Sequence, residues 1–317
     1  MNEIDYLRLS VTDRCNLNCF YCRPDKNLVQ LPPKEILSFE EIVKFLNLAT
    51  HWGIKHVRVT GGEPLVRRNI VSLVKMLSSV QGIEELTMTT NGLRLAELAL
   101  PLKEAGLSRI NVSLDSLDRR KFSEITGCDE LGEVLRGIAA ARRVGLDPIK
   151  VNMVLLKGFN EEEIFHFVSF ALENCLLVRF IEHMPINEIG GKRWYIPNTE
   201  VRERIQKKWG PLEPVDSSPG KGPAHYFRVN KRQPTLGFIS PLSEPFCDSC
   251  NRLRLTADGK LRSCLLSGFE VDLKGVLREG APRETMKELY EKVIRNKPKH
   301  HHFEFPYAGR FMFEIGG

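Results

Sequence analysis

The chain has 317 residues and a mass of 36.2 kDa, enough for one large α/β domain or for one domain with an appendage. Hydrophobic residues make up 42% and charged residues 27%, values typical of globular proteins, which excludes a disordered or collagenous chain. The net charge of +6 is small for this length and argues against a broad nucleic-acid-binding face, while an anionic small ligand remains compatible with it.

Short β-branched or apolar runs alternate with longer segments of helical period, starting at the N-terminus. This alternation is typical of βα units that build a parallel sheet. Six strands are predicted, at Leu7–Val11, His56–Thr60, Glu85–Thr89, Arg109–Ser113, Lys150–Val154 and Leu177–Glu182. Each precedes a loop and then a helix, so six consecutive βα units are expected.

The helices are predicted from apolar stripes and capping signals. Ser38 and Glu41 form a capping box, after which apolar residues share one face until Gly53. Another helix is expected to start at Asn160, where acidic residues follow in the first turn. Further stripes follow Ile70, Leu95 and Val134, and one late helix is expected around Glu284–Asn296.

The periodicity stops between Gly210 and Pro223, where proline and glycine are abundant, and we place a domain boundary there. Six βα units without a glycine-rich dinucleotide motif favour a barrel over a doubly wound sheet. The predicted fold is therefore α/β: an incomplete (β/α)6 TIM-like barrel in residues 1–210 and a smaller C-terminal iron–sulfur domain in residues 211–317. Chemistry is expected in the loops that follow the strands. One further strand is predicted near Gly237–Ser240.

Targeting signals are not visible in the sequence. The first ten residues lack an apolar region, and the most apolar stretch, Ile164 to Ile181, is interrupted by polar and charged residues. A cytoplasmic protein without a membrane role is expected. Eight cysteines in such a protein indicate metal ligation or redox chemistry instead of a disulfide framework.

Three of these cysteines, Cys15, Cys19 and Cys22, follow the first strand with C-x3-C-x2-C spacing. Structural zinc usually takes four ligands, whereas a cubane cluster can use three thiolates and keep one iron open for a small ligand. With an aromatic residue before the last cysteine, this triplet resembles the radical S-adenosylmethionine (SAM) superfamily. That resemblance implies a [4Fe-4S] cluster whose fourth iron binds SAM and whose electron releases a 5′-deoxyadenosyl radical.

The second predicted strand ends in Thr60-Gly61-Gly62-Glu63-Pro64, where two glycines allow close backbone approach of a ligand and Glu63 offers an acceptor. Alone, this segment is also explained by a plain turn. The resemblance implies that this motif receives the amino group of SAM. It implies further SAM contacts at four positions: Tyr21 through its backbone, Gly62, Ser113 and Met184.

A second triplet, Cys247, Cys250 and Cys264, has C-x2-C-x13-C spacing. Neither histidine nor cysteine lies between Cys264 and His300, so one position of a metal centre is expected to stay open. The surrounding C-N-R-x-R-L-T-x-D-G-x-L-x-x-C-L segment, together with the first triplet and the terminal diglycine, resembles the GTP 3′,8-cyclase family, also called molybdenum cofactor biosynthesis protein A. The resemblance spans nearly the whole chain.

This resemblance implies a lyase that converts GTP to (8S)-3′,8-cyclo-7,8-dihydroguanosine 5′-triphosphate, the first step of molybdenum cofactor biosynthesis. The 5′-deoxyadenosyl radical would take the ribose 3′ hydrogen, and the carbon radical would attack C8. The second triplet would hold a second [4Fe-4S] cluster whose open iron binds the guanine. Implied partners are GTP, a reductant such as a flavodoxin or ferredoxin, and the next enzyme, cyclic pyranopterin monophosphate synthase; the resemblance also allows a homodimer.

Basic residues on the predicted apolar strands require an explanation, because an unpaired buried charge is costly. A triphosphate would supply the counter-charge, and salt bridges to Glu63, Asp115 or Glu182 are the alternative. The resemblance implies GTP contacts at seven positions: Arg8, Arg58, Thr89, Lys150, Arg252, Leu253 and Arg254. Arg179 is compatible with the same role.

The chain ends in Gly316-Gly317, which in most proteins would be a frayed end. The resemblance implies that this end reaches the active site, and it makes Gly316 and Gly317 candidate catalytic positions beside Arg252 and Arg254. The run His300–His302 has no assigned role. Two alternatives remain open: a radical maturase whose extra cluster serves a peptide or electron transfer, and a zinc-stabilised binding module.

Overall fold

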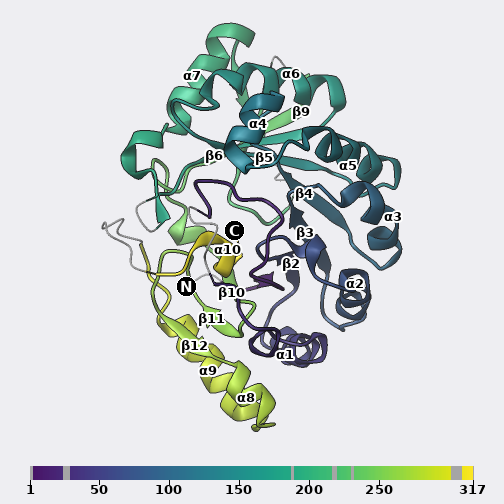
Figure 1. The fold of residues 1–317 in the computed structure, drawn as a ribbon. Helices are drawn as coiled ribbons and strands as arrows, with labels where there is room; N and C mark the ends of the chain where they lie inside the picture. Colours follow the sequence, from purple (N-terminus) through teal and green to yellow (C-terminus); the bar gives the residue numbers. More distant parts are fainter. Residues whose placement is uncertain are drawn as a thin grey trace.

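A computed structural model of the chain describes residues 3–23, 29–186, 189–215, 220–229, 232–300 and 309–316. Six parallel strands pair in chain order and curve around a central opening (Figure 1). They are β1 (Tyr6–Ser10), β2 (His56–Thr60), β3 (Glu85–Thr90), β4 (Arg109–Ser113), β5 (Lys150–Leu155) and β6 (Leu177–Glu182). The prediction of six parallel strands is confirmed, and each predicted end lies within one residue of the observed end.

Helices follow the strands and lie mostly outside the curved sheet (Figure 1). They are α1 (Phe39–His51), α2 (Ile70–Ser78), α3 (Leu95–Glu104), α4 (Arg119–Thr126), α5 (Leu131–Arg143) and α6 (Ile164–Asn174). The capping box is confirmed, because Ser38 Oγ accepts from the Glu41 amide at 3.2 Å and the Ser38 amide donates to the Glu41 carboxylate at 2.7 Å. α1 thereby begins where the sequence predicts.

The predicted start of α6 at Asn160 is wrong by four residues. A 3₁₀ turn covers Glu161–Glu163, and the Asn160 side chain does not cap the helix. Instead, its amide donates to the backbone oxygens of Asp115 and Val154, each at 2.8 Å, and its oxygen accepts from the Leu156 amide. Asn160 thus joins the ends of β4 and β5, which is a tertiary role that a helix-start pattern cannot distinguish from a cap.

The C-terminal strands extend the same sheet at both of its edges. β10 (Arg252–Leu255) pairs in parallel with β1, and β9 (Arg232–Ile239) pairs in parallel with β6. The full order is β12-β11-β10-β1-β2-β3-β4-β5-β6-β9-β8-β7, with β7 (Leu212–Pro214), β8 (His225–Val229), β11 (Lys260–Arg262) and β12 (Glu270–Asp272). The strand expected near residue 237 is the end of β9. The other five were not predicted, and each spans only three to five residues.

Four more helices complete the described part of the chain: α7 (Asn198–Trp209), α8 (Lys274–Arg278), α9 (Arg283–Arg295) and α10 (Met312–Ile315). α9 confirms the late helix that the sequence predicts. α10 lies in the middle of the opening that the strands surround, close to the C-terminus (Figure 1). None of the helices among the described residues is long and apolar enough to cross a membrane.

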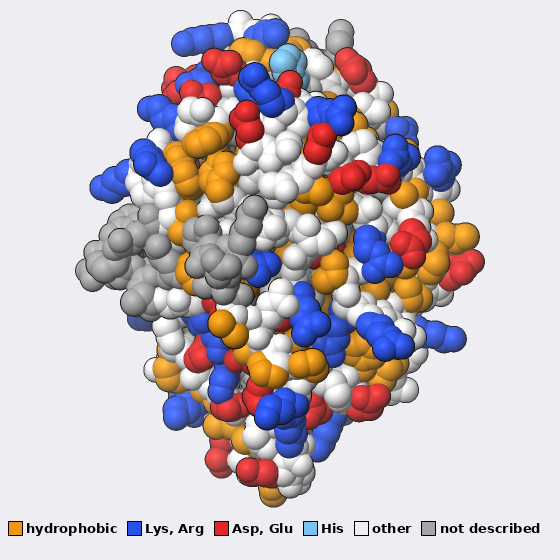
Figure 2. All heavy atoms as spheres, viewed as in Figure 1, with side chains coloured by type: hydrophobic (Ala, Val, Ile, Leu, Met, Phe, Trp, Pro, Cys, Tyr) orange, Lys and Arg blue, Asp and Glu red, His pale blue; other side chains and the backbone are white. Residues whose placement is uncertain are grey.

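Side chains alternate along the strands between the outer core and the barrel interior. On β1, Leu7 and Leu9 are fully buried in the hydrophobic core, whereas Arg8 lines the central cavity. The same alternation brings Arg58, Arg179 and Arg254 inside. On the surface, by contrast, basic and acidic side chains are interspersed on the face drawn in Figure 2. Cationic side chains therefore converge inside the barrel.

Candidate active site

One cavity of about 350 Å³ lies inside the barrel and is lined by both cysteine triplets. Cys15, Cys19 and Cys22 come from the loop after β1, and Cys247, Cys250 and Cys264 come from segments on either side of β10 and β11. All eight cysteines of the chain are free thiols. The two triplets therefore share one space, although more than 220 residues separate them in the sequence.

The first triplet is held in a tight loop that packs against α4. The Asn18 amide donates to the Thr126 carbonyl at 2.8 Å, and the amides of Cys22 and Arg23 both donate to the Cys19 carbonyl. Burial raises the pKa of Cys15 to about 11 and of Cys22 to about 12, and it raises the pKa of Cys19 strongly. Glu63 adds to the shift at Cys15. Thiols with such a raised pKa lose their protons at neutral pH when a metal cation binds the sulfur in place of the proton.

The glycine pair lines the cavity and also packs against the segment before the first triplet. The Gly62 amide donates to the Thr12 carbonyl at 2.6 Å, and the Glu63 amide donates to the Arg14 carbonyl at 2.7 Å. A Cβ on Gly61 or Gly62 would overlap with this Thr12–Arg14 segment. The close approach observed at the two glycines is that of the protein's own backbone, and contact of Gly62 with SAM stays a prediction.

The four positions implied for SAM all line the cavity: Tyr21, Gly62, Ser113 and Met184. The Tyr21 hydroxyl donates to Asp115 at 2.6 Å, and Asp115 also accepts from the Val154 amide. Burial raises the pKa of Asp115 to about 6 and that of Glu63 to about 7. The end of the cavity near the first triplet therefore carries two carboxyl groups, and none of the four positions implied for SAM is basic.

The second triplet lies in a cationic environment. Cys247–Ser249 form a 3₁₀ turn, and the Cys250 amide donates to the Cys247 carbonyl at 3.1 Å. Burial alone would raise the pKa of the Cys250 thiol, but the cations of Arg252 and Lys297 lower it to about 7. Lys297 Nζ lies 3.4 Å from Cys250 Sγ and donates to the carbonyl oxygens of Arg252 and Ser263 at 2.8 and 2.7 Å.

Sequence reasoning missed Lys297. It follows α9, carries no motif, and lies 33 residues after the last cysteine of the second triplet. Its three contacts join the segment that carries Cys250 to the backbone beside Cys264. Lys297 therefore orders both parts of the second triplet.

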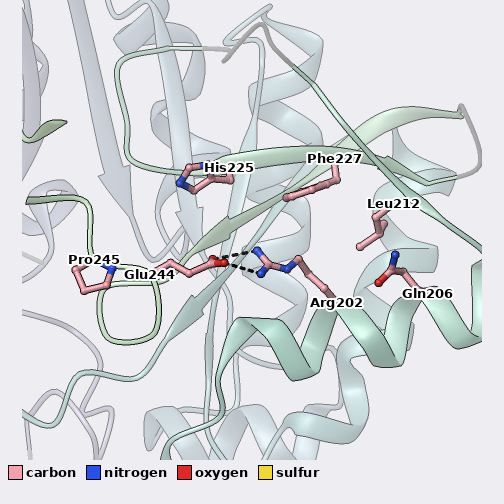
Figure 3. A pocket seen from close by; sticks show the side chains of 7 residues that line it. All are labelled: Arg202, Gln206, Leu212, His225, Phe227, Glu244 and Pro245. Atoms are coloured by element: carbon pink, nitrogen blue, oxygen red, sulfur yellow. Dashed lines mark hydrogen bonds and ion pairs between the residues drawn. The ribbon is translucent and has the colours of Figure 1, made fainter. Parts of the chain in front are cut away.

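The loop before Cys247 is anchored by two acidic residues. Glu182, at the end of β6, accepts from the amides of Leu242 and Ser243 at 3.0 Å each. Glu244 forms a bidentate ion pair with Arg202 of α7, at 2.7 and 3.0 Å, inside a surface cavity of about 590 Å³ (Figure 3). The ion pair in this second cavity thus helps to anchor the loop that leads to Cys247.

Most of the residues implied for GTP line the central cavity: Arg8, Arg58, Thr89, Arg252 and Arg254, and Arg179 joins them. Arg58 donates to the Tyr6 hydroxyl. When the side-chain oxygen of Asn111 faces the two guanidinium groups, it accepts from Arg58 and, at 2.9 Å, from Arg179. Burial lowers the pKa of Arg179 and of Arg254 to about 10. Positive charge is therefore concentrated at this end of the cavity.

Two of the implied positions do not line the cavity. Lys150 is buried with its Nζ 5.8 Å from the centre of the Tyr226 ring, and burial followed by the charge of Arg179 lowers its pKa to about 6. Leu253 is fully buried in the hydrophobic core. A role for Leu253 in binding would belong to its main chain.

The salt-bridge alternative for the interior arginines is not supported, because the three carboxylates have other partners. Glu63 accepts from the amides of Leu65 and Asn91 and from the Thr90 hydroxyl, at 2.6 to 2.9 Å. Asp115 binds Tyr21 and Val154, and Glu182 accepts from the cysteine loop and from the Asn198 amide. These acids hold loops in place at the cavity.

The end of the chain enters the barrel. The Gly316 carbonyl accepts from Arg254 at 2.6 Å and from Arg8 at 3.4 Å, while Gly317 lies outside the described residues. At Gly316 φ is +81°, and a Cβ there would overlap with the Thr60 hydroxyl, so glycine is required. Upstream, Arg310 pairs with Asp258 at 2.7 and 2.9 Å and with Glu270 at 3.0 and 3.1 Å. This clamp directs α10 into the opening.

Replacing Arg310 with alanine should release the end of the chain. Breaking a partly buried pair typically costs about 3 kcal/mol or more, so hydrogen exchange of the Gly316 amide should accelerate by about 100-fold. Exchange measured by mass spectrometry on residues 309–316 tests this, with Arg295→Ala as control, because Arg295 forms an exposed ion pair with Glu291. Unchanged exchange in Arg310→Ala would show that the clamp does not hold the tail.

Neither triplet is arranged as the ligand set of a single metal ion. Among the described residues, no three His, Cys, Asp or Glu side chains are close enough together to hold one metal ion. A cubane binds each thiolate to a different iron and therefore needs more widely spaced sulfurs.

His300 lies 3.7 Å from Asp248, and the remaining histidines of its run lie outside the described residues.

Comparisons with known proteins identify the family. The radical SAM superfamily matches residues 9–171, and the molybdenum cofactor synthesis C family matches residues 176–303. A GTP 3′,8-cyclase of Moorella thermoacetica is 45% identical over 99% of this chain and 98% of its own length. The chain belongs to the GTP 3′,8-cyclase family. Another family member, from Thermodesulfovibrio yellowstonii, is 47% identical over 94% of this chain and 92% of its own length.

Solved structures share the radical SAM fold with this family member. Streptococcus suis SuiB bound to S-adenosylmethionine has a TM-score of 0.62 at 17% identity, over 93% of this chain and 68% of SuiB. SuiB bound to its precursor peptide has a TM-score of 0.63 at 15% identity, over 97% of this chain and 76% of SuiB. Membership in the radical SAM superfamily brings a [4Fe-4S] cluster and SAM, for which the first triplet has the matching residues.

Proposed function

We propose that the chain converts GTP to (8S)-3′,8-cyclo-7,8-dihydroguanosine 5′-triphosphate, the first step of molybdenum cofactor biosynthesis. Family membership supports the reaction, and the opposite polarity of the two cavity ends supports the placement of its two ligands. Glu63 acts on Cys15 and Asp115 acts on Cys19 of the first triplet, whereas Arg252 contacts Cys250 and Arg254 lies near Cys250 and Cys264. A sulfonium cation and a nucleoside triphosphate anion match these two ends.

The chain's own residues would bind and orient the two reactants. Arg8, Arg58 and Arg179 would neutralise the triphosphate, while Arg252 and Arg254 would flank the guanine beside the second triplet. Cys15, Cys19 and Cys22 would hold the first cluster, which would supply the electron that cleaves SAM for removal of the ribose 3′ hydrogen. Holding both ligands in one closed space turns this hydrogen transfer into a step between fixed neighbours.

The resemblance to the family supports further proposals for this chain. A second [4Fe-4S] cluster on Cys247, Cys250 and Cys264 would bind the guanine. Closing the ring needs one further electron and a proton, for which a cytoplasmic flavodoxin or ferredoxin is the proposed reductant. Residues 1–210 would carry the radical chemistry and residues 211–317 the second cluster. A homodimer and delivery of the product to cyclic pyranopterin monophosphate synthase complete the proposal.

Lys150 should make GTP binding depend on pH. With a pKa of about 6, its amine is mostly neutral at pH 7.5, and a nearby triphosphate favours the charged form. Binding of GTP should therefore take up as much as about one proton, and the affinity should fall as pH rises from 7 to 9. Calorimetry in buffers of different ionisation enthalpy measures the uptake. The Lys150→Met variant should lose it, and equal uptake in both proteins would contradict this assignment.

The proposed function is tested by anaerobic incubation with SAM, reductant and one of several nucleotides. Formation of 5′-deoxyadenosine with GTP, and much less with ATP or with peptides, is the expected result. Activity with a peptide in place of GTP would favour the radical maturase alternative. Metal analysis of anaerobically purified protein separates the zinc-module alternative, since two cubanes require about eight irons with matching sulfide and no zinc.

A further inference from the structure

His183 is a buried polar residue at the cavity that neither the reaction nor the fold explains. It follows β6 directly and precedes Met184. Its side chain is 2% exposed, it lines the central cavity, and neither ring nitrogen has a hydrogen-bond partner among the described residues. Leaving buried donors and acceptors unpaired is costly, so such a group in a cavity wall indicates a ligand atom.

Aromatic neighbours fix the orientation of the His183 ring. The Tyr21 ring lies 6.3 Å away at 88°, and the Trp194 ring lies 5.5 Å away at 69°. Burial lowers the pKa of His183 to about 4, so the imidazole is neutral at physiological pH. A neutral imidazole offers one N–H donor and one acceptor nitrogen, which suits a neutral heterocycle better than a phosphate or a carboxylate.

The surroundings of His183 distinguish which ligand it would meet. This end of the cavity is lined by apolar side chains: Val154, Ile181, Ile186 and Ile189. Tyr21 and Asp115 of the first-triplet end are also nearby, since the Tyr21 ring contacts His183 and the Tyr21 hydroxyl binds Asp115. An apolar wall with one neutral donor and acceptor is what a purine base requires. Of the interior arginines, Arg179 alone lies on β6, and its Nε donates to the Asn152 side chain at 2.7 Å.

We propose that His183 hydrogen-bonds a ring nitrogen of the adenine of SAM, and thereby selects and orients the cofactor. This inference rests on the proposed function only in taking the first-triplet end as the SAM site. A net hydrogen bond of about 1 kcal/mol corresponds to about 5-fold in affinity, and an unsatisfied partner raises this towards 10-fold. His183 would therefore contribute to SAM binding and leave GTP binding unchanged.

The test is a double-mutant cycle between the residue and the base. The dissociation constant is measured anaerobically, by equilibrium dialysis against the cluster-loaded protein, for SAM and for its 1-deaza, 3-deaza and 7-deaza analogues. His183→Phe should weaken SAM binding by about 5- to 10-fold, and His183→Gln, which keeps a donor and an acceptor, should restore most of it. One analogue lacks the ring nitrogen that His183 binds. The native protein should bind this analogue as weakly as His183→Phe binds SAM, and His183→Phe should weaken its binding no further.

Native affinity of His183→Phe for SAM, or an equal loss for SAM and all three analogues, would overturn the proposal. A matched measurement of GTP affinity shows whether the variant is folded, because GTP binding should stay within about 2-fold of the native value. Loss of GTP binding alone, with SAM binding intact, would also contradict it. If GTP failed to trigger SAM cleavage, the proposed function would be refuted. The double-mutant cycle for His183 would still be interpretable, because it measures only the binding of SAM and its analogues.

Discussion

Replacing Cys250 with serine should weaken GTP binding by about 100-fold or more, while SAM binding stays within about 2-fold. Even changes around the ligands of a metal site cost 10- to 100-fold, and loss of a thiolate removes the iron that would hold the guanine. The pKa of Cys250 is also lowered to about 7 by Arg252 and Lys297, which favours its binding as a thiolate. Calorimetry of both ligands with the variant measures the two affinities.

The matched variant is Cys15→Ser, which should show the reverse pattern. Cys15 lines the same cavity but lies in the first-triplet loop, where its sulfur accepts from the Leu17 amide. Because the first triplet would hold the cluster that binds SAM, loss of Cys15 should abolish SAM binding and spare most GTP binding. Cys175→Ser is the control, because Cys175 is exposed beyond the end of α6. Iron content should fall from about eight to about four in each triplet variant. Equal losses of both ligands in both variants would contradict separate roles.

Replacing Arg58 with alanine should weaken GTP binding by about 10- to 100-fold. A hydrogen bond to a charged group contributes about 1.5–3 kcal/mol, and Arg58 is 5% exposed in a cavity wall that holds several other cations. The affinity for guanosine, which lacks phosphates, should change by less than about 3-fold. Comparing GTP with guanosine therefore separates a phosphate contact from a general loss of structure.

Two controls sharpen this comparison. Arg58→Lys keeps a charge without the planar donor pair and should fall between the native protein and the alanine variant. Arg120→Ala removes an exposed arginine of α4 and should leave both affinities unchanged. A native GTP affinity in Arg58→Ala, or parallel losses for GTP and guanosine, would show that Arg58 does not bind the phosphates.

Local signals in the sequence were sufficient for most of the barrel. The capping box at Ser38 and the apolar runs of β2, β4 and β6 predict the observed bounds, because each depends on neighbours in the chain. The inward arginines were visible for the same reason, since charges on buried strands break an apolar pattern. The cysteine spacing likewise indicated two incomplete ligand sets, and the structure places both sets along one cavity.

Residues that act across long sequence distances could not be predicted. Lys297 joins segments 45 and 34 residues away, and Arg310 pairs with acids 52 and 40 residues away. β10 lies beside β1 although about 240 residues separate them, which no local pattern encodes. The packing of the Thr12–Arg14 segment against Gly62 was likewise not visible in the sequence.

The most direct test of the whole account is to follow the ribose hydrogen. GTP carrying deuterium at C3′ is incubated anaerobically with the cluster-loaded protein, SAM and a reductant, and 5′-deoxyadenosine and the nucleotide product are analysed by mass spectrometry. The account predicts one deuterium in 5′-deoxyadenosine and a cyclised triphosphate that has lost it. Unlabelled 5′-deoxyadenosine, or GTP recovered unchanged while SAM is cleaved, would contradict it.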